Sequence, residues 1–520
     1  MTRILLFSLI LAIFNPISAQ NLQRIGHLSY GPLSLAGCWH HVDAAGTEWA
    51  LVGTSAGLSL VDLSNPTQPV ERFMVPGLSN NWREVRTWQG YAYVTTEADS
   101  SGVTIVNLNH LPDSIPWKTW RGDGFFVNRV LRNHAVQVHD GYLYLFGGSN
   151  IANGAVIADL IDPWNPKIRS KYAATYVHDG FVRGDTMWTC ELNAAQFGVI
   201  DISNKTNPVL LATHPTPGGF NHNCELSADG RTLFHTQEAL NLPMTAYDVS
   251  NLDDITLLDS YKPSRKPEGE VHNVRMMPGD FVVCPSYRGQ LTIVDASQPD
   301  NMIEIAWDSL GNSLVWDADP YLPSGILLAT AKQEGLYIYE VTYTPAARLE
   351  GVLRDAVTGL PISEAKVFVL NTFLADSTGF NGVYKTGAAN SGLYAIRAER
   401  VGYQTQVKTG VNLVSGQTTQ LDFALVPESV STSEALLGDA PKVSPSPFLD
   451  VLQVDFPESL RGEYGLRLLD FSGKTVQEKQ GESSSFILFE GLQNLPKGPY
   501  LLQIMGKNGL NYTFQVLKGG

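Results

Sequence analysis

The sequence has few cysteines, few charged residues and, after its first 20 residues, no long hydrophobic run. No CxxC pair occurs, which argues against a zinc or redox motif built on cysteine. In an oxidising compartment the four thiols could form two disulfides in any of three pairings, or remain free and buried. No stretch after residue 20 approaches 18 apolar residues, so we expect no transmembrane segment in the mature chain. The cysteines are Cys38, Cys190, Cys224 and Cys284.

Positive charge is also scarce. The chain of 520 residues has 36 Lys and Arg against 51 Asp and Glu, a net charge of −15. Such a surface repels phosphate backbones, which excludes nucleic acid as a partner. GxSxG, HExxH and a phosphate-binding glycine loop are absent as well. Glycine and proline are plentiful, with 47 and 29 residues, and this favours many short strands joined by turns.

The first residues have the pattern of a secretory signal peptide. Arg3 gives a positive start, residues 4–14 form an apolar core, and Ile17-Ser18-Ala19 is a small-residue cleavage site. Eleven apolar residues span only about 16 Å as a helix, which is too short for a bilayer. We therefore predict that residues 1–19 are removed on export.

One short phrase recurs seven times along the chain. "GLSLVDLSNPTQPV" at residues 57–70 returns in forms such as "FGVIDISNKTNPVLL" and "GQLTIVDASQPDNMIEI". The acidic or amide residues that close the phrase are spaced by 45, 52, 42, 47, 47 and 45 residues. A period in the forties is typical of a four-stranded propeller blade. These closing residues are Asp62, Asn107, Asp159, Asp201, Asp248, Asp295 and Glu340.

The fold class is therefore predicted to be all-β, with a seven-bladed β-propeller over residues 20–344. The seventh phrase lacks a following fourth strand, whereas residues 22–30 look like an isolated one. We predict that this segment pairs with residues 335–340 and closes the ring, because closure removes two exposed sheet edges. An open array is the alternative. The phrase resembles the LVIVD repeat, and residues 22–341 resemble the choice-of-anchor B family of exported bacterial proteins, which implies a surface or extracellular propeller and no known catalytic set.

Two further small β-sandwich domains are predicted behind the propeller. Residues 347–427, with "DAVTGLPISEAKVFVL" and "SGLYAIRAERVGYQTQ", resemble the carboxypeptidase regulatory-like domain, a transthyretin-like sandwich without peptidase chemistry. Residues 428–442 read as a linker. Residues 443–520, with "LPKGPYLLQI", resemble the C-terminal sorting domain of the type IX secretion system of Bacteroidetes, although Ser446 stands where that family often has Asn. The resemblance implies the secretion machinery as a partner and a secreted, extracellular or outer-membrane-surface location.

Polar residues recur near the start of each predicted blade. Innermost strands line a propeller's channel, so these side chains could converge and bind a metal or an anion, or exchange protons. Alternatively, each could hydrogen-bond the backbone of a neighbouring blade and hold the strands in register. "HNCE", residues 222–225, matches the HxxE spacing of zinc carboxypeptidases, but residues i and i+3 of a strand point to opposite faces. The candidates are His40, Arg83, His134, His178, His222, His272 and Trp316-Asp317.

The predicted function is that of a secreted or cell-surface binding or structural protein. Its propeller loops would contact a polysaccharide, a peptide or an envelope partner. The alternative is an extracellular hydrolase or lyase that uses histidines and carboxylates at the channel mouth. No cofactor is predicted, and a structural metal is left open. Aromatic residues that could stack against a ligand or pack between blades are Trp82, Trp88, Trp117, Trp120, Phe125, Phe126, Trp164 and Tyr287.

Overall fold

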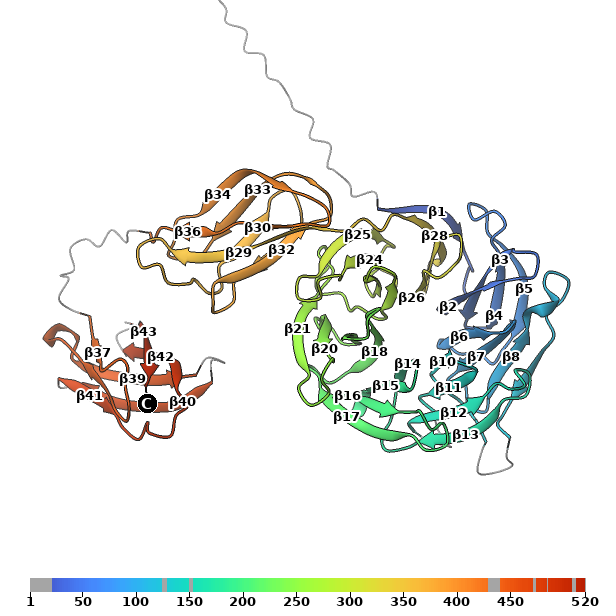
Figure 1. The fold of residues 1–520 in the computed structure, drawn as a ribbon, viewed down its shortest axis with the longest axis horizontal. Helices are drawn as coiled ribbons and strands as arrows, with labels where there is room; N and C mark the ends of the chain where they lie inside the picture. The colour runs from blue at the N-terminus through green and yellow to red at the C-terminus, as the bar shows by residue number, and fades with distance from the viewer. Residues whose placement is uncertain are drawn as a thin grey trace, which may run out of the picture. The chain divides into compact units, whose positions relative to one another are not determined.

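The computed structural model describes residues 21–123, 129–148, 153–428, 440–470, 474–483, 485–506 and 511–519 (Figure 1). The predicted signal peptide, Phe125 and Phe126, and most of the predicted linker lie outside these ranges. The described residues form strands and three short 3₁₀ helices, η1 (Leu108–His110), η2 (Leu192–Ala194) and η3 (Glu458–Leu460). The all-β prediction is confirmed. No helix in the described ranges is both long and apolar enough to span a membrane.

Residues 22–341 form seven four-stranded antiparallel sheets, which we call blades 1 to 7. The blades are arranged in a ring (Figure 1). In every neighbouring pair except blades 6 and 7 the two innermost strands lie against each other, and there β26 contacts β23 instead. Alternating apolar residues of the middle strands are buried on both faces, because each sheet is covered by two neighbours. Blade 1 is β2 (Leu35–Val42), β3 (Glu48–Thr54), β4 (Gly57–Asp62) and β5 (Val70–Pro76); blade 2 is β6 (Arg83–Trp88), β7 (Tyr91–Thr96), β8 (Val103–Asn107) and β9 (Trp117–Trp120); blade 3 is β10 (Ala135–His139), β11 (Tyr142–Phe146), β12 (Ala155–Asp159) and β13 (Lys167–Tyr172).

The remaining blades repeat this order. Blade 4 is β14 (Asp179–Arg183), β15 (Thr186–Glu191), β16 (Gln196–Asp201) and β17 (Val209–Pro215); blade 5 is β18 (Asn221–Leu226), β19 (Thr232–Gln237), β20 (Met244–Asp248) and β21 (Thr256–Tyr261); blade 6 is β22 (Arg275–Met277), β23 (Phe281–Ser286), β24 (Gln290–Asp295) and β25 (Ile303–Ser309); blade 7 is β26 (Val315–Asp319), β27 (Leu327–Ala331), β28 (Gly335–Val341) and β1 (Leu22–Leu28).

The recurrent phrase forms the third strand of each blade and the turn after it. The Asp62 carboxylate accepts hydrogen bonds from the Ser64 backbone N–H at 2.8 Å and from the Ser64 hydroxyl at 2.6 Å. The same Asp-to-Ser contact recurs at Asp201, Asp248 and Asp295. These side chains replace backbone partners where the third strand ends, which explains why the sequence repeats them.

The N-terminal strand closes the ring as predicted. Strand β1 pairs antiparallel with β28, with Leu22 opposite Val341 and Leu28 opposite Leu336. Its register shifts between Arg24 and Gly26, as the register shifts between the third and fourth strands of blades 1, 3, 4, 5 and 6. Strand β1 therefore has the geometry of a fourth strand, although it comes first in the chain.

The two smaller β domains each have their own apolar core, and the chain divides into two compact units, residues 1–427 and 428–520. The first contains, behind the propeller, two sheets: β32–β29–β35, with β36 also paired to β29, and β31–β30–β33–β34. The second contains the sheets β37–β38–β41 and β40–β39–β42–β43. The strands are β29 (Ala347–Asp355), β30 (Lys366–Val369), β31 (Ala375–Ser377), β32 (Val383–Ala388), β33 (Gly392–Glu399), β34 (Gln406–Leu413), β35 (Thr418–Gln420), β36 (Phe423–Leu425), β37 (Lys442–Ser444), β38 (Leu452–Asp455), β39 (Gly462–Leu469), β40 (Thr475–Ser483), β41 (Phe486–Phe489), β42 (Gly498–Gly506) and β43 (Asn511–Lys518).

All four cysteines are buried and free. Burial raises the pKa of the Cys284 thiol, and burial together with a neighbouring thiol raises that of Cys190. Of the two sequence-based alternatives, disulfides or buried free thiols, the structure has the second.

Candidate functional site

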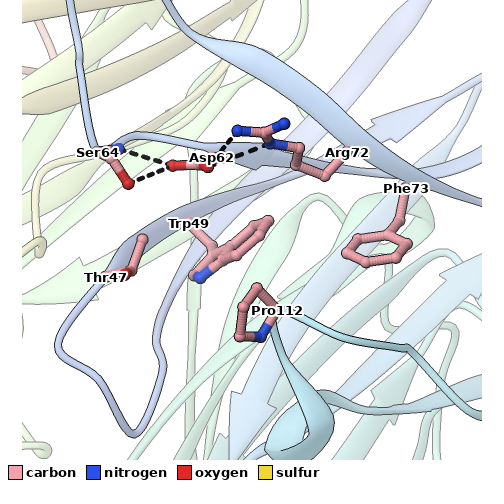
Figure 2. A pocket seen from close by; sticks show the side chains of 7 residues that line it. All are labelled: Thr47, Trp49, Asp62, Ser64, Arg72, Phe73 and Pro112. Carbon is pink, nitrogen blue, oxygen red and sulfur yellow. Dashed lines mark hydrogen bonds and ion pairs between the residues drawn. The ribbon is translucent and has the colours of Figure 1, made fainter.

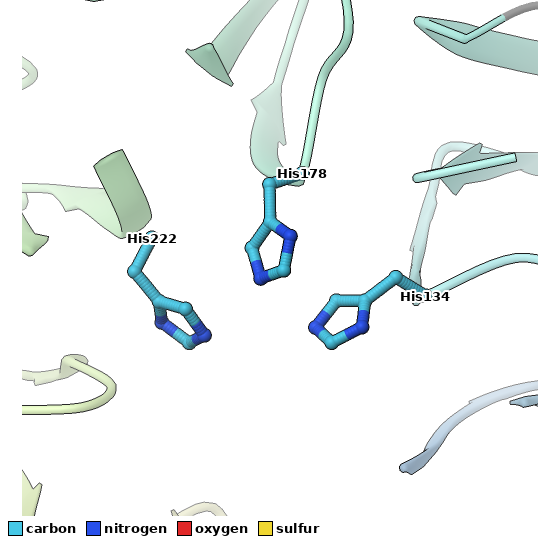
Figure 3. Close-up of side chains that lie close together, drawn as sticks. All are labelled: His134, His178 and His222. Atoms are coloured by element: carbon cyan, nitrogen blue, oxygen red, sulfur yellow. The ribbon is translucent and has the colours of Figure 1, made fainter. Parts of the chain in front are cut away.

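Four of the predicted histidines lie at the starts of four consecutive innermost strands. His134 directly precedes β10, His178 directly precedes β14, His222 is the second residue of β18, and His272 lies three residues before β22. Each therefore occupies the position at which the chain enters its blade next to the channel. Figure 3 shows the first three side chains converging from separate blades.

The imidazole rings form a continuous row. Ring centroids are 3.9 Å apart between His134 and His178, 5.0 Å between His178 and His222, and 4.1 Å between His222 and His272. All four residues are buried. Because burial removes water as a hydrogen-bond partner, each ring nitrogen needs a protein or ligand partner.

The hydrogen bonds of two of the rings determine their tautomers. His222 Nδ1 donates to the backbone carbonyl of His272 at 2.8 Å, and His272 Nδ1 donates to that of Trp316 at 2.6 Å. A carbonyl oxygen can only accept, so both rings carry their proton on Nδ1. When neutral, each then presents an Nε2 lone pair. An imidazole held through Nδ1 in this way is the usual arrangement of a metal ligand.

The nitrogens that face one another have no partner. Among the described residues, nothing hydrogen-bonds the buried Nε2 atoms of His178, His222 and His272. His134 Nδ1 contacts the Glu97 carboxylate at 2.7 Å, and His178 Nδ1 contacts the Tyr176 hydroxyl at 3.3 Å. His178, His222 and His272 are thus each hydrogen-bonded through Nδ1 and unsatisfied at Nε2, which costs free energy unless a ligand binds there.

Two sets of metal-binding atoms overlap at His222. Ligand atoms of His134, His178 and His222 lie within 4.8 Å of one another, and so do those of His222, Glu238 and His272. Glu238 Oε2 is 3.6 Å from His222 Nε2, and Glu238 Oε1 is 3.8 Å from His272 Nε2. Tetrahedral zinc with bonds of about 2.0–2.1 Å needs ligand atoms roughly 3.4 Å apart. The two Glu238 contacts are already close to this spacing, whereas ligand atoms as far as 4.8 Å apart would have to move closer together.

The protonation states suit ligation. Burial, with the neighbouring imidazoles, lowers the pKa of His178 and of His272 well below the usual value, and burial also lowers the pKa of His222. Burial opposes the protonation of His134, but the hydrogen bond and charge of Glu97 raise the pKa of this ring. At neutral pH the first three rings are in the neutral form that binds metals.

Of the other predicted site residues, Trp316 lies beside the cluster, since its ring centroid is 4.4 Å from that of His272 and its carbonyl accepts from His272 Nδ1. His40, Arg83 and Asp317 have other partners. His40 Nδ1 contacts Asp319 at 2.8 Å. The strand position that His272 holds in blade 6 is held in blade 1 by Ala36. The two positions are equivalent because the Ala36 carbonyl accepts from the Thr330 hydroxyl as the His272 carbonyl accepts from the Thr236 hydroxyl. The Arg83 guanidinium donates to the carbonyls of Thr54 and Leu78, and burial lowers its pKa to about 10. The Asp317 carboxylate accepts from Arg275 at 2.6 Å, deeper in the ring.

Sequence reasoning missed residues that directly follow the second strand of a blade. Glu97 follows β7, Glu238 follows β19, and Lys332 follows β27. Each stands two residues after a threonine whose hydroxyl donates to a carbonyl of the next blade, at 3.1, 2.8 and 2.6 Å. The sequence pattern that could have identified these three residues is therefore the recurring T-x-E/K at the ends of "YVTTE", "FHTQE" and "LLATAK".

A buried group of charges lies beside the histidines. Glu84 accepts a hydrogen bond from Trp316 Nε1 at 2.9 Å. Burial and the nearby charge of Asp317 raise the pKa of Glu84 to about 7. The folded protein therefore holds this proton more tightly than the unfolded chain, and wild-type stability falls as the pH rises from about 4.5 through 7.

We expect Glu84→Gln to remove this pH dependence. The variant should be more stable than wild type by on the order of 1–3 kcal/mol at pH 8.5 and nearly equal to it at pH 5, as measured by urea denaturation. Glu268→Gln, which changes an exposed carboxylate, is the matched control. A stability difference that is the same at both pH values would contradict the assignment.

A separate pocket of about 420 Å³ lies at the outer edge of blade 1 (Figure 2). Its polar groups bind one another: Asp62 accepts from Ser64 and from Arg72. The pocket therefore has fewer polar groups that are free to bind a ligand than the histidine cluster has. Its lining residues are Thr47, Trp49, Asp62, Ser64, Arg72, Phe73 and Pro112.

The predicted aromatic residues divide between packing and exposure. Trp120 and Tyr287 are buried, whereas Trp82 and Trp117 are 39% and 43% exposed. Trp88 and Trp164 are half-buried. Trp82 precedes an innermost strand, whereas Trp117 begins an outermost strand. The two exposed tryptophans therefore do not form one surface.

Comparison with known proteins assigns three parts of the chain. Residues 47–76 and 193–216 match the LVIVD repeat, residues 348–426 match the carboxypeptidase regulatory-like domain, and residues 442–518 match the secretion system C-terminal sorting domain. No curated protein matches the sequence. Among solved structures, the β-propeller domain of Myceliophteria thermophila Cps50 (Swd1) is 12% identical, with a TM-score of 0.46, over 62% of this chain and 100% of that one.

The class of protein follows from the repeat and the tail together. The sorting domain is of the type IX secretion kind, so the protein is exported and is either secreted or held at the cell surface. It carries an LVIVD-repeat propeller, a carboxypeptidase regulatory-like domain and this tail in one chain.

Proposed function

We propose that the protein is an exported metal-binding protein whose propeller channel holds one divalent first-row transition metal. The observation that carries the proposal is the pair of ligand sets that overlap at His222. The buried Nε2 atoms of His178, His222 and His272 within these sets have no hydrogen-bond partner among the described residues. Imidazole and carboxylate donors together suit zinc, copper, nickel or iron, and three protein ligands leave a further position for water or a ligand.

The expected stoichiometry is one metal per chain. His222 belongs to both donor sets, yet its Nδ1 is engaged with a carbonyl and only Nε2 remains. A neutral imidazole nitrogen has one lone pair, so the two sets cannot each bind a metal through it at the same time. A polysaccharide, peptide or envelope partner that contacts the loops stays a prediction from the sequence.

Zinc titration of the full chain tests the proposal. Isothermal titration calorimetry should give one site, and His222→Gln should weaken zinc binding by at least about 100-fold, because losing even an outer-shell partner of a ligand costs 10–100-fold. His110→Ala, which changes an exposed histidine outside the cluster, should bind zinc as wild type does. Thermal melts show whether each variant is folded.

Two results would overturn the metal site. One is a wild-type chain that binds no zinc after chelation and dialysis. The other is a folded His222→Gln variant whose zinc affinity equals that of wild type, since the cluster would then serve only to hold neighbouring blades together.

A further inference from the structure

Lys332 is a largely buried lysine whose ammonium keeps some contact with solvent but has no anionic partner among the described residues. The residue is 8% exposed, and among the described residues no carboxylate or carbonyl lies within ion-pair or hydrogen-bond distance of its ammonium. The ammonium instead lies over two indole rings, 4.0 Å from the centroid of Trp316 and 5.3 Å from that of Trp82. Buried lysines are normally paired, so this side chain needs an explanation.

Lys332 holds the same position in its blade as two residues that lie next to the histidine cluster. Lys332 directly follows the second strand of blade 7, as Tyr287 does in blade 6 and Glu238 in blade 5. Equivalent positions of successive blades lie at one depth around the channel. The Tyr287 hydroxyl donates to Glu238 at 2.7 Å, and the Tyr287 ring stacks on His272 at 4.6 Å. These three residues therefore form a row above the imidazoles.

One aromatic ring separates the ammonium from the metal ligands. The Trp316 ring that Lys332 covers lies 4.4 Å from the ring of His272. Burial lowers the pKa of Lys332, while the charges of Glu238 and Glu84 oppose this. The Glu238 charge also opposes the fall in the pKa of His222, and the Glu84 charge contributes to the raised pKa of His134, so both carboxylates act on the ammonium and on the cluster. Trp82 is exposed and the Glu238 side chain is 25% exposed, so both of these neighbours reach solvent.

We propose that Lys332 binds an oxyanion group of a small ligand whose other end reaches the channel metal. The ligand is a carboxylate or phosphate compound about as long as one aromatic ring is wide, and a small dicarboxylate fits this description. The indoles of Trp82 and Trp316 then hold the ammonium in place and contact the apolar part of the ligand. This inference rests on the proposed metal function and names the class of ligand that the metal would bind.

Anion titrations of the zinc-loaded full chain test the inference. We expect succinate or inorganic phosphate to bind, and Lys332→Gln to weaken that binding at least tenfold, which is the loss expected for one charge-assisted hydrogen bond. Lys332→Arg keeps the charge and should retain affinity within about threefold. Lys167→Gln, on an exposed outer strand, is the matched control. Binding of succinate alone assigns the site to carboxylates, and binding of phosphate alone assigns it to phosphates.

The outcomes separate this inference from the metal proposal. If zinc binds but neither anion does, or if a folded Lys332→Gln variant binds the anion as wild type does, the anion site is wrong and the metal site stands. If wild type binds no zinc, the metal proposal fails, and anion titration of the zinc-free chain against Lys332→Gln decides whether Lys332 binds anions alone. In Lys332→Gln the zinc affinity itself should change by less than about threefold.

Discussion

A chain that lacks residues 21–30 is expected to lose the cooperative unfolding of the propeller and to aggregate. Strand β1 supplies the fourth strand of blade 7, and Leu22, Ile25 and Leu28 pack against the cores of blades 6, 7 and 1. Burying an apolar side chain of this size contributes about 1.5–3 kcal/mol when burial is complete. The three side chains are half-buried, so their loss together removes a few kcal/mol, which is a substantial part of the stability of a typical domain.

The deletion also exposes an edge. Without β1, strand β28 presents unpaired N–H and C=O groups along most of its length, and such an edge favours pairing between chains. Differential scanning calorimetry and size-exclusion chromatography would detect both effects. Gly26→Val should act in the same direction, because a Cβ at Gly26 would lie 2.1 Å from the Pro66 carbonyl oxygen.

Arg24→Gln provides the control for β1. This change on β1 removes an exposed ion pair with Asp308 of β25 but leaves the pairing with β28 intact. Exposed pairs contribute about 1 kcal/mol or less, so the melting temperature should change little. A truncated chain that melts at the wild-type temperature as a monomer would contradict the role of β1 in closing the ring.

The fold was predictable because local and global signals agree. The recurrent Asp-x-Ser turn appears in the sequence as a repeat and in the structure as the same hydrogen bonds, for example at Asp62 and Asp248. The position of β1 was predictable because the seventh phrase lacked a fourth strand. Neither inference required knowledge of contacts between distant side chains.

The site was predictable only where residues share one strand position. His134, His178, His222 and His272 occupy equivalent positions, and reading the start of each blade found them. His40 differs because blade 1 has Ala36 at that position, and a register shift between Leu35 and Cys38 hides the offset. A single sequence cannot reveal a shift of this kind.

Glu238 and Lys332 were missed for another reason. Both lie beyond the second strand and act on a neighbouring or more distant blade, so their role depends on how blades pack. "HNCE" suggested Glu225 as the carboxylate near His222. In the structure the Glu225 carboxylate instead accepts a hydrogen bond from the backbone N–H of Met276 at 2.7 Å and lies 3.5 Å from the Arg275 guanidinium. The carboxylate near His222 is that of Glu238.

Replacement of Arg275 by methionine is expected to destabilise the propeller by about 3–5 kcal/mol at pH 8, the range measured when one partner of a buried ion pair is removed. Arg275 is buried in β22 and donates to Asp317 at 2.6 Å, with Glu225 at 3.5 Å. Methionine fills much of the same volume but leaves two buried carboxylates without a cation.

The cost of Arg275→Met should shrink as the pH falls. Burial already raises the pKa of Glu225, and Arg275 opposes that rise. Without the guanidinium, the Glu225 carboxylate of the folded state holds its proton still more tightly than that of the unfolded chain. The variant therefore gains stability relative to wild type between pH 8 and pH 5. Urea denaturation at several pH values measures this slope.

Two further variants decide whether charge is the cause. Arg275→Met combined with Asp317→Asn removes one of the stranded carboxylates and should recover part of the loss at pH 8, with a smaller dependence on pH. Arg72→Met breaks the exposed pair with Asp62 at the blade surface and should cost about 1 kcal/mol or less. If Arg275→Met costs the same at pH 5 as at pH 8, the side chain stabilises the channel through packing, and the buried charges around it are balanced without it.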